Sequence, residues 1–185
     1  SIMRPHLAIA MLALVAGAPS AFAQQAVPST GVPPVSENKV DTDTFTKALV
    51  SANRFEIESS KLALKKGVAA DVKVFAELMV KDHTKAGQDF KAALETSQTT
   101  ASVTPEGPPL LPNDQAMLDQ LEALDGDAFQ AKYITLQMQA HKQAVAMFST
   151  YAQSGDDPAL KEFAKKTLET LKMHEMHVRD LSAVH

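Results

Sequence analysis

The chain of 185 residues is 45% hydrophobic and 22% charged, the composition of one soluble globular domain with short appendages. Its formal net charge is −4 and it contains no block of like charges, so the sequence gives no reason to expect a nucleic-acid partner. It contains no cysteine, which excludes disulfides, thiol catalysis and thiolate metal sites.

The first 23 residues have the pattern of an export signal. Arg4 supplies a positive charge, and residues 7–18 form the apolar run that follows it. Residues 21–23 (Ala-Phe-Ala) match the small-x-small pattern that signal peptidase reads. The run is shorter than the roughly 20 apolar residues of a membrane span. We therefore expect a signal peptide that is cleaved before Gln24, a periplasmic protein, and no transmembrane span after cleavage.

Residues 24–41 are expected to be a flexible, proline-rich linker. Pro28, Pro33 and Pro34 stand there among Ser, Thr, Gly and Val, a composition that supports neither a helix nor a core. The domain itself is predicted to span residues 42–183. No stretch alternates polar and apolar residues over a useful length, so strands are not expected.

Four long helices and one short helix are predicted from capping residues and from apolar residues that recur every three or four positions. The long helices are expected at about residues 43–66, 70–97, 127–153 and 158–183. A short helix through Leu124 is expected in the connection between the second and third long helices.

The ends of these helices carry unequal signals. Gly67 suits the left-handed residue that ends a helix, and Asp157 followed by proline is a strong start signal. Asp127 and Gln130 have the spacing of a capping box that would open the third long helix. The start of the second long helix is poorly marked, because residues 68–70 (Val-Ala-Ala) are weak capping residues.

The predicted fold is an all-α four-helix bundle with a short extra helix between the second and third long helices. The connection between those two helices runs from Gln98 to Gly126. It is long enough to cross the length of the bundle and leave the two helices parallel, as in ferritin-like bundles. It can also form a long loop in an up-down bundle, and both topologies remain open.

Each long helix has one polar residue on its otherwise apolar face. In the second helix His83 lies four residues after Met79, within the apolar stripe. His141, His174 and Glu56 hold the same kind of position in the third, fourth and first helices. All four residues lie near helix midpoints, within about one and a half turns of one another along the bundle. We therefore predict that they form one cluster.

The residue types of this cluster suit a single metal ion. Three His and one Glu offer ligands that Zn, Cu, Fe and Mn accept, and the sequence does not distinguish these metals. Burying a carboxylate is costly unless it is paired or bound to metal. The alternative is a packing network in which the Glu and His side chains share protons.

Four stretches resemble the helices of domain-of-unknown-function family 4142: FEIESSKLAL, VKVFAELMVKDHTKA, YITLQMQAHKQAVAMF and DPALKEFAKKTLETLKMH. The resemblance covers residues 42–182 and implies a ferritin-like bundle in an exported bacterial protein, without an established activity. A di-iron site is not expected, because it needs Glu-x-x-His on two helices. Val80, Met138 and Leu171 stand three residues before the three histidines.

The sequence is compatible with two functions. One is a periplasmic bundle that binds one metal ion and serves in the envelope stress response. The other is a non-enzymatic envelope module whose helical surface binds a second copy of the chain or another envelope protein. No nucleophile motif, phosphate loop or cofactor fingerprint is present, so the sequence does not decide whether the protein is an enzyme.

Overall fold

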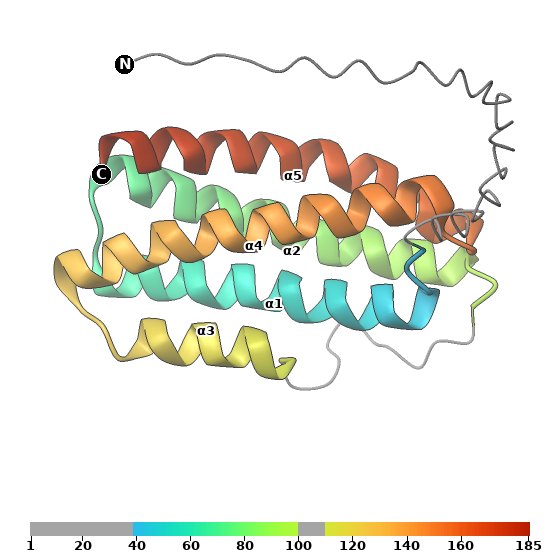
Figure 1. The fold of residues 1–185 in the computed structure, drawn as a ribbon, viewed down its shortest axis with the longest axis horizontal. Coiled ribbons are helices and arrows are strands. Elements are labelled where there is room, and N and C mark those ends of the chain that lie inside the picture. Colours follow the sequence, from blue (N-terminus) through green and yellow to red (C-terminus); the bar gives the residue numbers. More distant parts are fainter. Residues whose placement is uncertain (1–38, 100–109) are drawn as a thin grey trace, which may run out of the picture. The chain divides into compact units, whose positions relative to one another are not determined.

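The structure is a computed structural model that describes residues 39–99 and 110–185. The predicted signal peptide and nearly all of the predicted linker lie outside these residues. The described helices are α1 (Thr42–Lys66), α2 (Ala70–Thr96), α3 (Pro112–Glu122), α4 (Gly126–Ser154) and α5 (Pro158–Val184). The predicted all-α fold, with its short extra helix α3, is confirmed (Figure 1).

The four long helices form a bundle of two antiparallel hairpins. One hairpin is α1 with α2 and the other is α4 with α5 (Figure 1). α1 packs against α4, and α2 packs against α5, so each helix has two neighbours in the bundle. α3 lies against α1 and α4. None of the helices in the described residues is both long and apolar enough to span a membrane.

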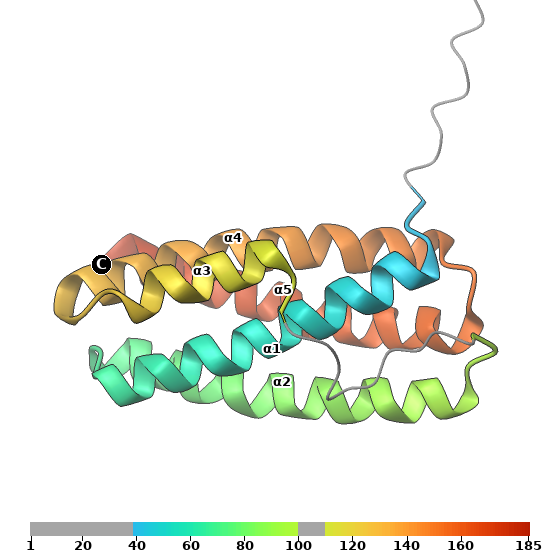
Figure 2. The same cartoon turned by 90° about the horizontal axis from the view of Figure 1, so that it is seen from below.

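The helices α2 and α4 run in the same direction, so the chain crosses the length of the bundle between them (Figure 2). Contacts at both ends of the bundle demonstrate this. The backbone N–H of Ala69, just before α2, donates to Oε1 of Gln130 near the start of α4 (2.7 Å). At the other end, Asp157 after α4 accepts from the backbone N–H of Gln98 after α2 (3.0 Å). Of the two predicted topologies, the chain adopts the ferritin-like crossover.

The helix ends confirm one predicted signal and correct another. Gly67 follows α1 with a φ of 82°, the positive value that glycine adopts without steric cost. The predicted capping box at Asp127 and Gln130 is wrong, because α4 already begins at Gly126 and has no side-chain cap. Gln130 instead accepts the N–H of Ala69. It thereby gives the start of α2 an acceptor that its own weak capping residues lack.

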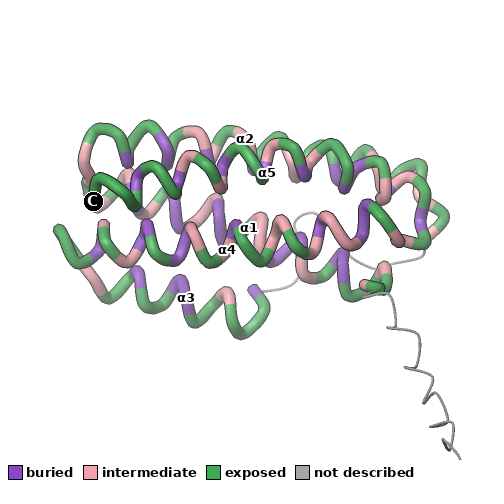
Figure 3. Tube along the Cα trace, turned by 45° about the horizontal axis from the view of Figure 1, so that its top comes forward, coloured by how far each residue is buried: buried purple, intermediate pink, exposed green. Residues whose placement is uncertain are grey.

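Two apolar clusters fill the bundle on either side of a polar layer. Phe75 and Tyr133 belong to one cluster, and Phe90 and Phe163 belong to the other. Along each of α2, α4 and α5, one buried histidine lies between residues of the two clusters. Buried positions recur along each helix between exposed ones, which is the pattern of a stripe facing a core (Figure 3).

Candidate metal centre

Three of the four predicted residues meet in the polar layer: His83 of α2, His141 of α4 and His174 of α5. One ring nitrogen of each lies within 4.8 Å of the corresponding nitrogens of the other two. The side chains are buried, with exposed fractions of 5%, 1% and 1%. The three rings also contact one another, with centroids 5.3 to 5.9 Å apart.

Asn53 of α1 fixes the ring of His83 and its tautomer. The amide nitrogen of Asn53 donates to the backbone oxygen of His83 (2.9 Å), so its Oδ1 is the atom that faces the ring. This oxygen accepts from Nδ1–H of His83 (2.9 Å). Nε2 of His83 is therefore the unprotonated nitrogen and carries the lone pair. The sequence reasoning missed Asn53, although its position three residues before Glu56 on α1 places both on one face.

The other two histidines are fixed in the same way. Nδ1–H of His141 donates to the backbone oxygen of Gln137 (2.8 Å), and Nε2–H of His174 donates to Oδ2 of Asp82 (2.8 Å). A carbonyl and a carboxylate can only accept, so each of these ring nitrogens holds the proton. The lone pairs of His141 and His174 therefore lie on Nε2 and Nδ1, respectively.

The three lone-pair nitrogens have no hydrogen-bond partner among the described protein atoms. A buried acceptor without a partner costs about 1–3 kcal/mol. In metal sites a ligating histidine typically donates its other ring N–H to a carbonyl or carboxylate, which orients the ring. All three histidines have this arrangement. The residues present therefore fit a single metal ion held by three neutral imidazoles.

Burial also keeps the histidines in the neutral form that a metal binds. It lowers the pKa of His83 well below the ordinary value, an effect that His141 and His174 reinforce. It lowers the pKa of His141 to about 4. The pKa of His174 is lowered by burial too, opposed by the hydrogen bond to Asp82. At neutral pH no proton therefore competes with a cation for these nitrogens.

Glu56 lies beside the three nitrogens rather than among them. Its Oε1 is 3.7 Å from Nδ1 of His141, which is the protonated nitrogen of that ring. Its Oε2 has no hydrogen-bond partner among the described protein atoms. Burial raises the pKa of Glu56 to about 8, an effect that the side-chain amide of Gln137 opposes. The metal-free protein therefore holds this carboxyl mainly protonated at neutral pH.

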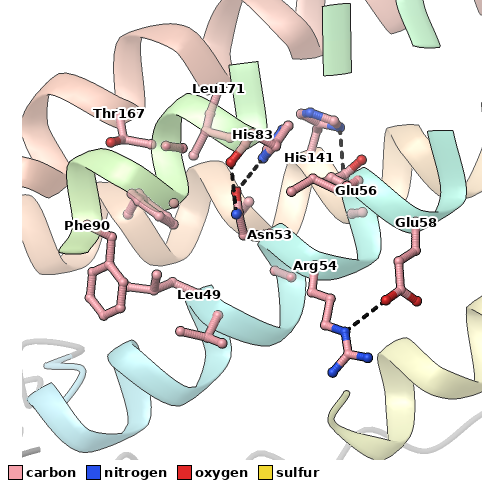
Figure 4. A pocket seen from close by; sticks show the side chains of 18 of the residues that line it. Leu49, Asn53, Arg54, Glu56, Glu58, His83, Phe90, His141, Thr167 and Leu171 are labelled. Carbon is pink, nitrogen blue, oxygen red and sulfur yellow. Dashed lines mark hydrogen bonds and ion pairs between the residues drawn. The ribbon is translucent and has the colours of Figure 1, made fainter. Parts of the chain in front are cut away.

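A cavity of about 210 Å³ adjoins the histidines (Figure 4). Glu56, His83 and His141 line it, and all four long helices contribute to its wall. The apolar side chains of the wall include Leu49, Phe90, Phe148, Phe163 and Leu171.

Comparison with known proteins supports the fold and gives the family. A solved structure described as CopM in the Cu(II)-bound form matches with a TM-score of 0.62 and 15% sequence identity, over 77% of this chain and 96% of that chain. At this identity the likeness shows the fold alone. No curated protein matches the sequence. The model of the family described as Domain of unknown function (DUF4142) matches residues 24–181. The family predicted from the four helical stretches is thus confirmed, and the chain belongs to DUF4142.

Proposed function

We propose that the protein binds one transition metal ion through His83, His141 and His174. The observation that carries this proposal is the orientation of the three rings. Each donates its protonated nitrogen to a fixed acceptor and leaves its other nitrogen buried without a partner, and one ring nitrogen of each lies within 4.8 Å of those of the other two. A site of this kind has its ligands in the required protonation state before the metal arrives.

The same observation argues against the alternative of a packing network. A hydrogen bond needs one proton between its two heavy atoms, and the three unpartnered nitrogens carry none. A network that existed only to fix the bundle would alternate donors and acceptors. The second predicted function, an envelope interaction module with such a network in its core, is therefore the weaker candidate.

Glu56 is proposed to balance the charge of the bound ion. A cation among the histidines favours the ionised form of a neighbouring carboxyl. Since the pKa of Glu56 is raised to about 8 by burial, metal binding at neutral pH is expected to release a proton from it. Isothermal titration in buffers of different ionisation enthalpy measures this release, and Glu56→Gln is expected to abolish it.

Copper and zinc are the first metals to test. Neutral imidazole suits both ions, and the chain has no cysteine to offer as a softer ligand. The Cu(II)-bound state of the structural neighbour is a further reason to include copper. Iron and manganese complete the set.

We also infer that the protein works in the periplasm after export. The support is the sequence pattern of residues 1–23, which indicates a cleaved signal. A metal-binding bundle in that compartment is consistent with a role in the envelope stress response. Mass analysis of the protein from the periplasmic fraction tests the export, with Gln24 as the expected first residue.

The metal proposal is tested on protein purified without a histidine tag. We expect about one equivalent of metal per chain, and His141→Ala is expected to lower the affinity by more than about 100-fold. His177→Ala is the matched control, because that ring packs edge-on against Phe75 rather than joining the three nitrogens. The proposal fails if the parent protein binds none of the four metals copper, zinc, iron and manganese.

A further inference from the structure

Two methionines of α5 lie on the surface, unlike the other methionines in the described part of the chain. Met173 and Met176 are 63% and 67% exposed, and neither is a member of the two apolar clusters. The other four described methionines pack in or against those clusters: Met79, Met117, Met138 and Met147. Methionine is a residue that proteins mostly bury. Core packing therefore does not account for the exposed pair.

The pair is not part of a larger apolar face. The residues beside it on α5 are charged: Lys172, Glu175, Arg179 and Asp180. The other exposed large apolar side chains among the described residues are Val74 on α2, Leu111 before α3 and Val184 at the last position of α5. A docking surface for an apolar partner would need a contiguous patch. The two thioethers instead stand together in charged surroundings.

A histidine with accessible ring nitrogens stands next to the pair. Met173 lies three residues before Met176 and four before His177, so it neighbours both across one helical turn. The ring of His177 packs against that of Phe75 on α2, with centroids 5.1 Å apart. Within the described residues, neither ring nitrogen of His177 makes a hydrogen bond, and neither is a buried atom. Unlike the three buried histidines, His177 has its nitrogens open to solvent.

The three side chains offer two thioether sulfurs and one imidazole nitrogen. Thioether is a soft ligand that selects Cu(I), and imidazole also suits copper. The Cβ atoms of helix residues three or four apart are roughly 5–6 Å from each other. Methionine is unbranched, with three rotatable bonds, so both sulfurs can approach one ion beside the histidine ring.

The charges near these donors do not oppose a cation. Within one turn α5 carries two cations, and each pairs with a carboxylate: Lys172 with Glu169 (3.8 Å) and Arg179 with Glu175 (3.2 Å). Asp180 adds a third carboxylate. On α2, Asp82 bonds to His174, and its neighbour Lys81 adds a charge of the opposite sign. Carboxylates thus exceed cations around the donors.

We propose that Met173, Met176 and His177 form a second metal site, at the surface of α5, which binds Cu(I). This site goes beyond the buried one and does not depend on it, because the two share no ligand. Their chemistry also differs, since two thioethers favour a soft monovalent ion and three imidazoles accept divalent ions.

The test uses the full chain and Ag(I), a soft monovalent ion that stands in for Cu(I) and is not oxidised by air. The protein is first stripped with chelator and then saturated with zinc, so that the buried histidines are occupied. Calorimetric titration in chloride-free buffer is expected to show about one further equivalent of Ag(I). Zinc uptake is measured before Ag(I) is added, so failure of the buried site and failure of the surface site are seen separately.

Two double variants decide where Ag(I) binds. Met173→Leu with Met176→Leu removes both sulfurs at little change in volume and is expected to lower the Ag(I) affinity about 100-fold or more. Met138→Leu with Met147→Leu removes the same number of thioethers from α4, and its affinity is expected to stay within about twofold of the parent. Equal Ag(I) uptake by the parent and the α5 variant would overturn the proposal, whether or not zinc is bound.

Methyl NMR of the zinc-treated parent protein locates the ion directly. We expect Ag(I) to shift the ε-methyl resonances of Met173 and Met176 and the ring resonances of His177. The methyl resonance of Met117, which is buried in the core cluster with Phe75, is expected to stay unchanged. Absence of a shift at any of the three proposed ligands would contradict this site.

Discussion

Asp82 on α2 holds the ring of His174, a candidate ligand on α5. It stands next to His83 in the sequence and accepts from Nε2–H of His174 on another helix (2.8 Å). Replacing Asp82 by Ala removes the group that fixes the tautomer and the orientation of that ring. We expect metal affinity to fall about 10–100-fold, the usual effect of losing such a partner. Competition titration with a chelating dye measures the change.

Asp89→Ala is the control for this variant. Asp89 lies on α2 one heptad after Asp82 and pairs with Lys85 on the helix surface (2.7 Å). Its removal deletes the same charge without touching a histidine, so affinity is expected to stay within about twofold of the parent. A comparable loss in both variants would mean that Asp82 acts through net charge and not through His174.

Glu56 makes the stability of the metal-free protein depend on pH. Burial raises its pKa from 4.5 to about 8, so the folded protein keeps this proton to a higher pH than the unfolded chain does. The folded state therefore loses stability as the pH rises from about 4.5 to 8, by up to about 1.4 kcal/mol per pH unit. The glutamine of the Glu56→Gln variant does not titrate. The free energy of unfolding of the variant minus that of the parent is therefore expected to increase steadily over that range.

Urea unfolding of both proteins at pH 5, 6, 7 and 8, with chelator present, measures this difference. The histidines are present in both proteins, so their titration largely cancels. Glu169→Gln on the exposed face of α5 controls for the substitution itself. A constant difference between Glu56→Gln and the parent across the four pH values would contradict the raised pKa.

The sequence was sufficient to predict which residues reach the polar layer but not what holds them there. His83, His141, His174 and Glu56 were identified because the inward face of a helix is a periodic property of the sequence. The partnership of Asn53 with His83 is different, since it depends on the distance between two helices. No spacing within one helix encodes that distance, so this partner emerged only from the packed structure.

At the level of the helices, Asp157 joins the start of α5 to the end of α2. Its Oδ1 accepts from the backbone N–H of Leu160, and its Oδ2 accepts from Oγ of Ser97 (2.5 Å) and the N–H of Gln98. Asp157→Ala removes a buried cap and leaves these donors without their acceptor. We expect the free energy of unfolding to fall by about 3 kcal/mol, measured by urea denaturation.

The N-cap of α1 provides the comparison. Asp41 accepts from the backbone N–H of Thr44 (2.8 Å) and is exposed, and within the described residues its side chain makes no hydrogen bond to a second helix. Asp41→Ala is expected to cost about 1 kcal/mol, the ordinary value of a helix cap. Equal losses in the two variants would mean that Asp157 contributes only as a cap and that its bonds to the end of α2 add nothing.

Helix boundaries were predictable wherever the cap is local. Asp157 and the glycine at position 67 act on their own helices, and both were identified from the sequence. The Gln130 signal misled because a capping box and a tertiary acceptor use the same residue type. Its side chain accepts from the backbone N–H of Ala69, which belongs to the other hairpin. A pattern of neighbouring residues in the sequence does not encode such a contact.

At the scale of the whole molecule, the sequence left the order of the helices in space undecided. The segment from Gln98 to Gly126 is long enough for either topology, because loop length limits the reach of a connection without fixing its path. The crossover is fixed by contacts at the two ends of the bundle, such as that between Ala69 and Gln130. Such contacts are properties of the assembled bundle.

Metal binding to the assembled bundle is expected to raise its melting temperature. A ligand that binds only the folded state adds about 2.7 kcal/mol when its free concentration is 100 times its Kd. For a domain of this size that corresponds to roughly 5–10 °C. Calorimetry with graded free metal measures the shift. His141→Ala, compared with its own metal-free form, is expected to show little of it. A melting temperature of the parent that does not respond to metal would contradict folded-state binding.

The long connection between α2 and α4 also divides the histidines between two pieces of the chain. The hairpin of α1 and α2 carries His83, whereas the hairpin of α4 and α5 carries His141 and His174. Cutting the chain between Thr99 and Leu110 would therefore give two fragments, neither of which contains all three histidines. A metal ion bound by histidines of both fragments would link them, so metal uptake would measure the association of the two fragments.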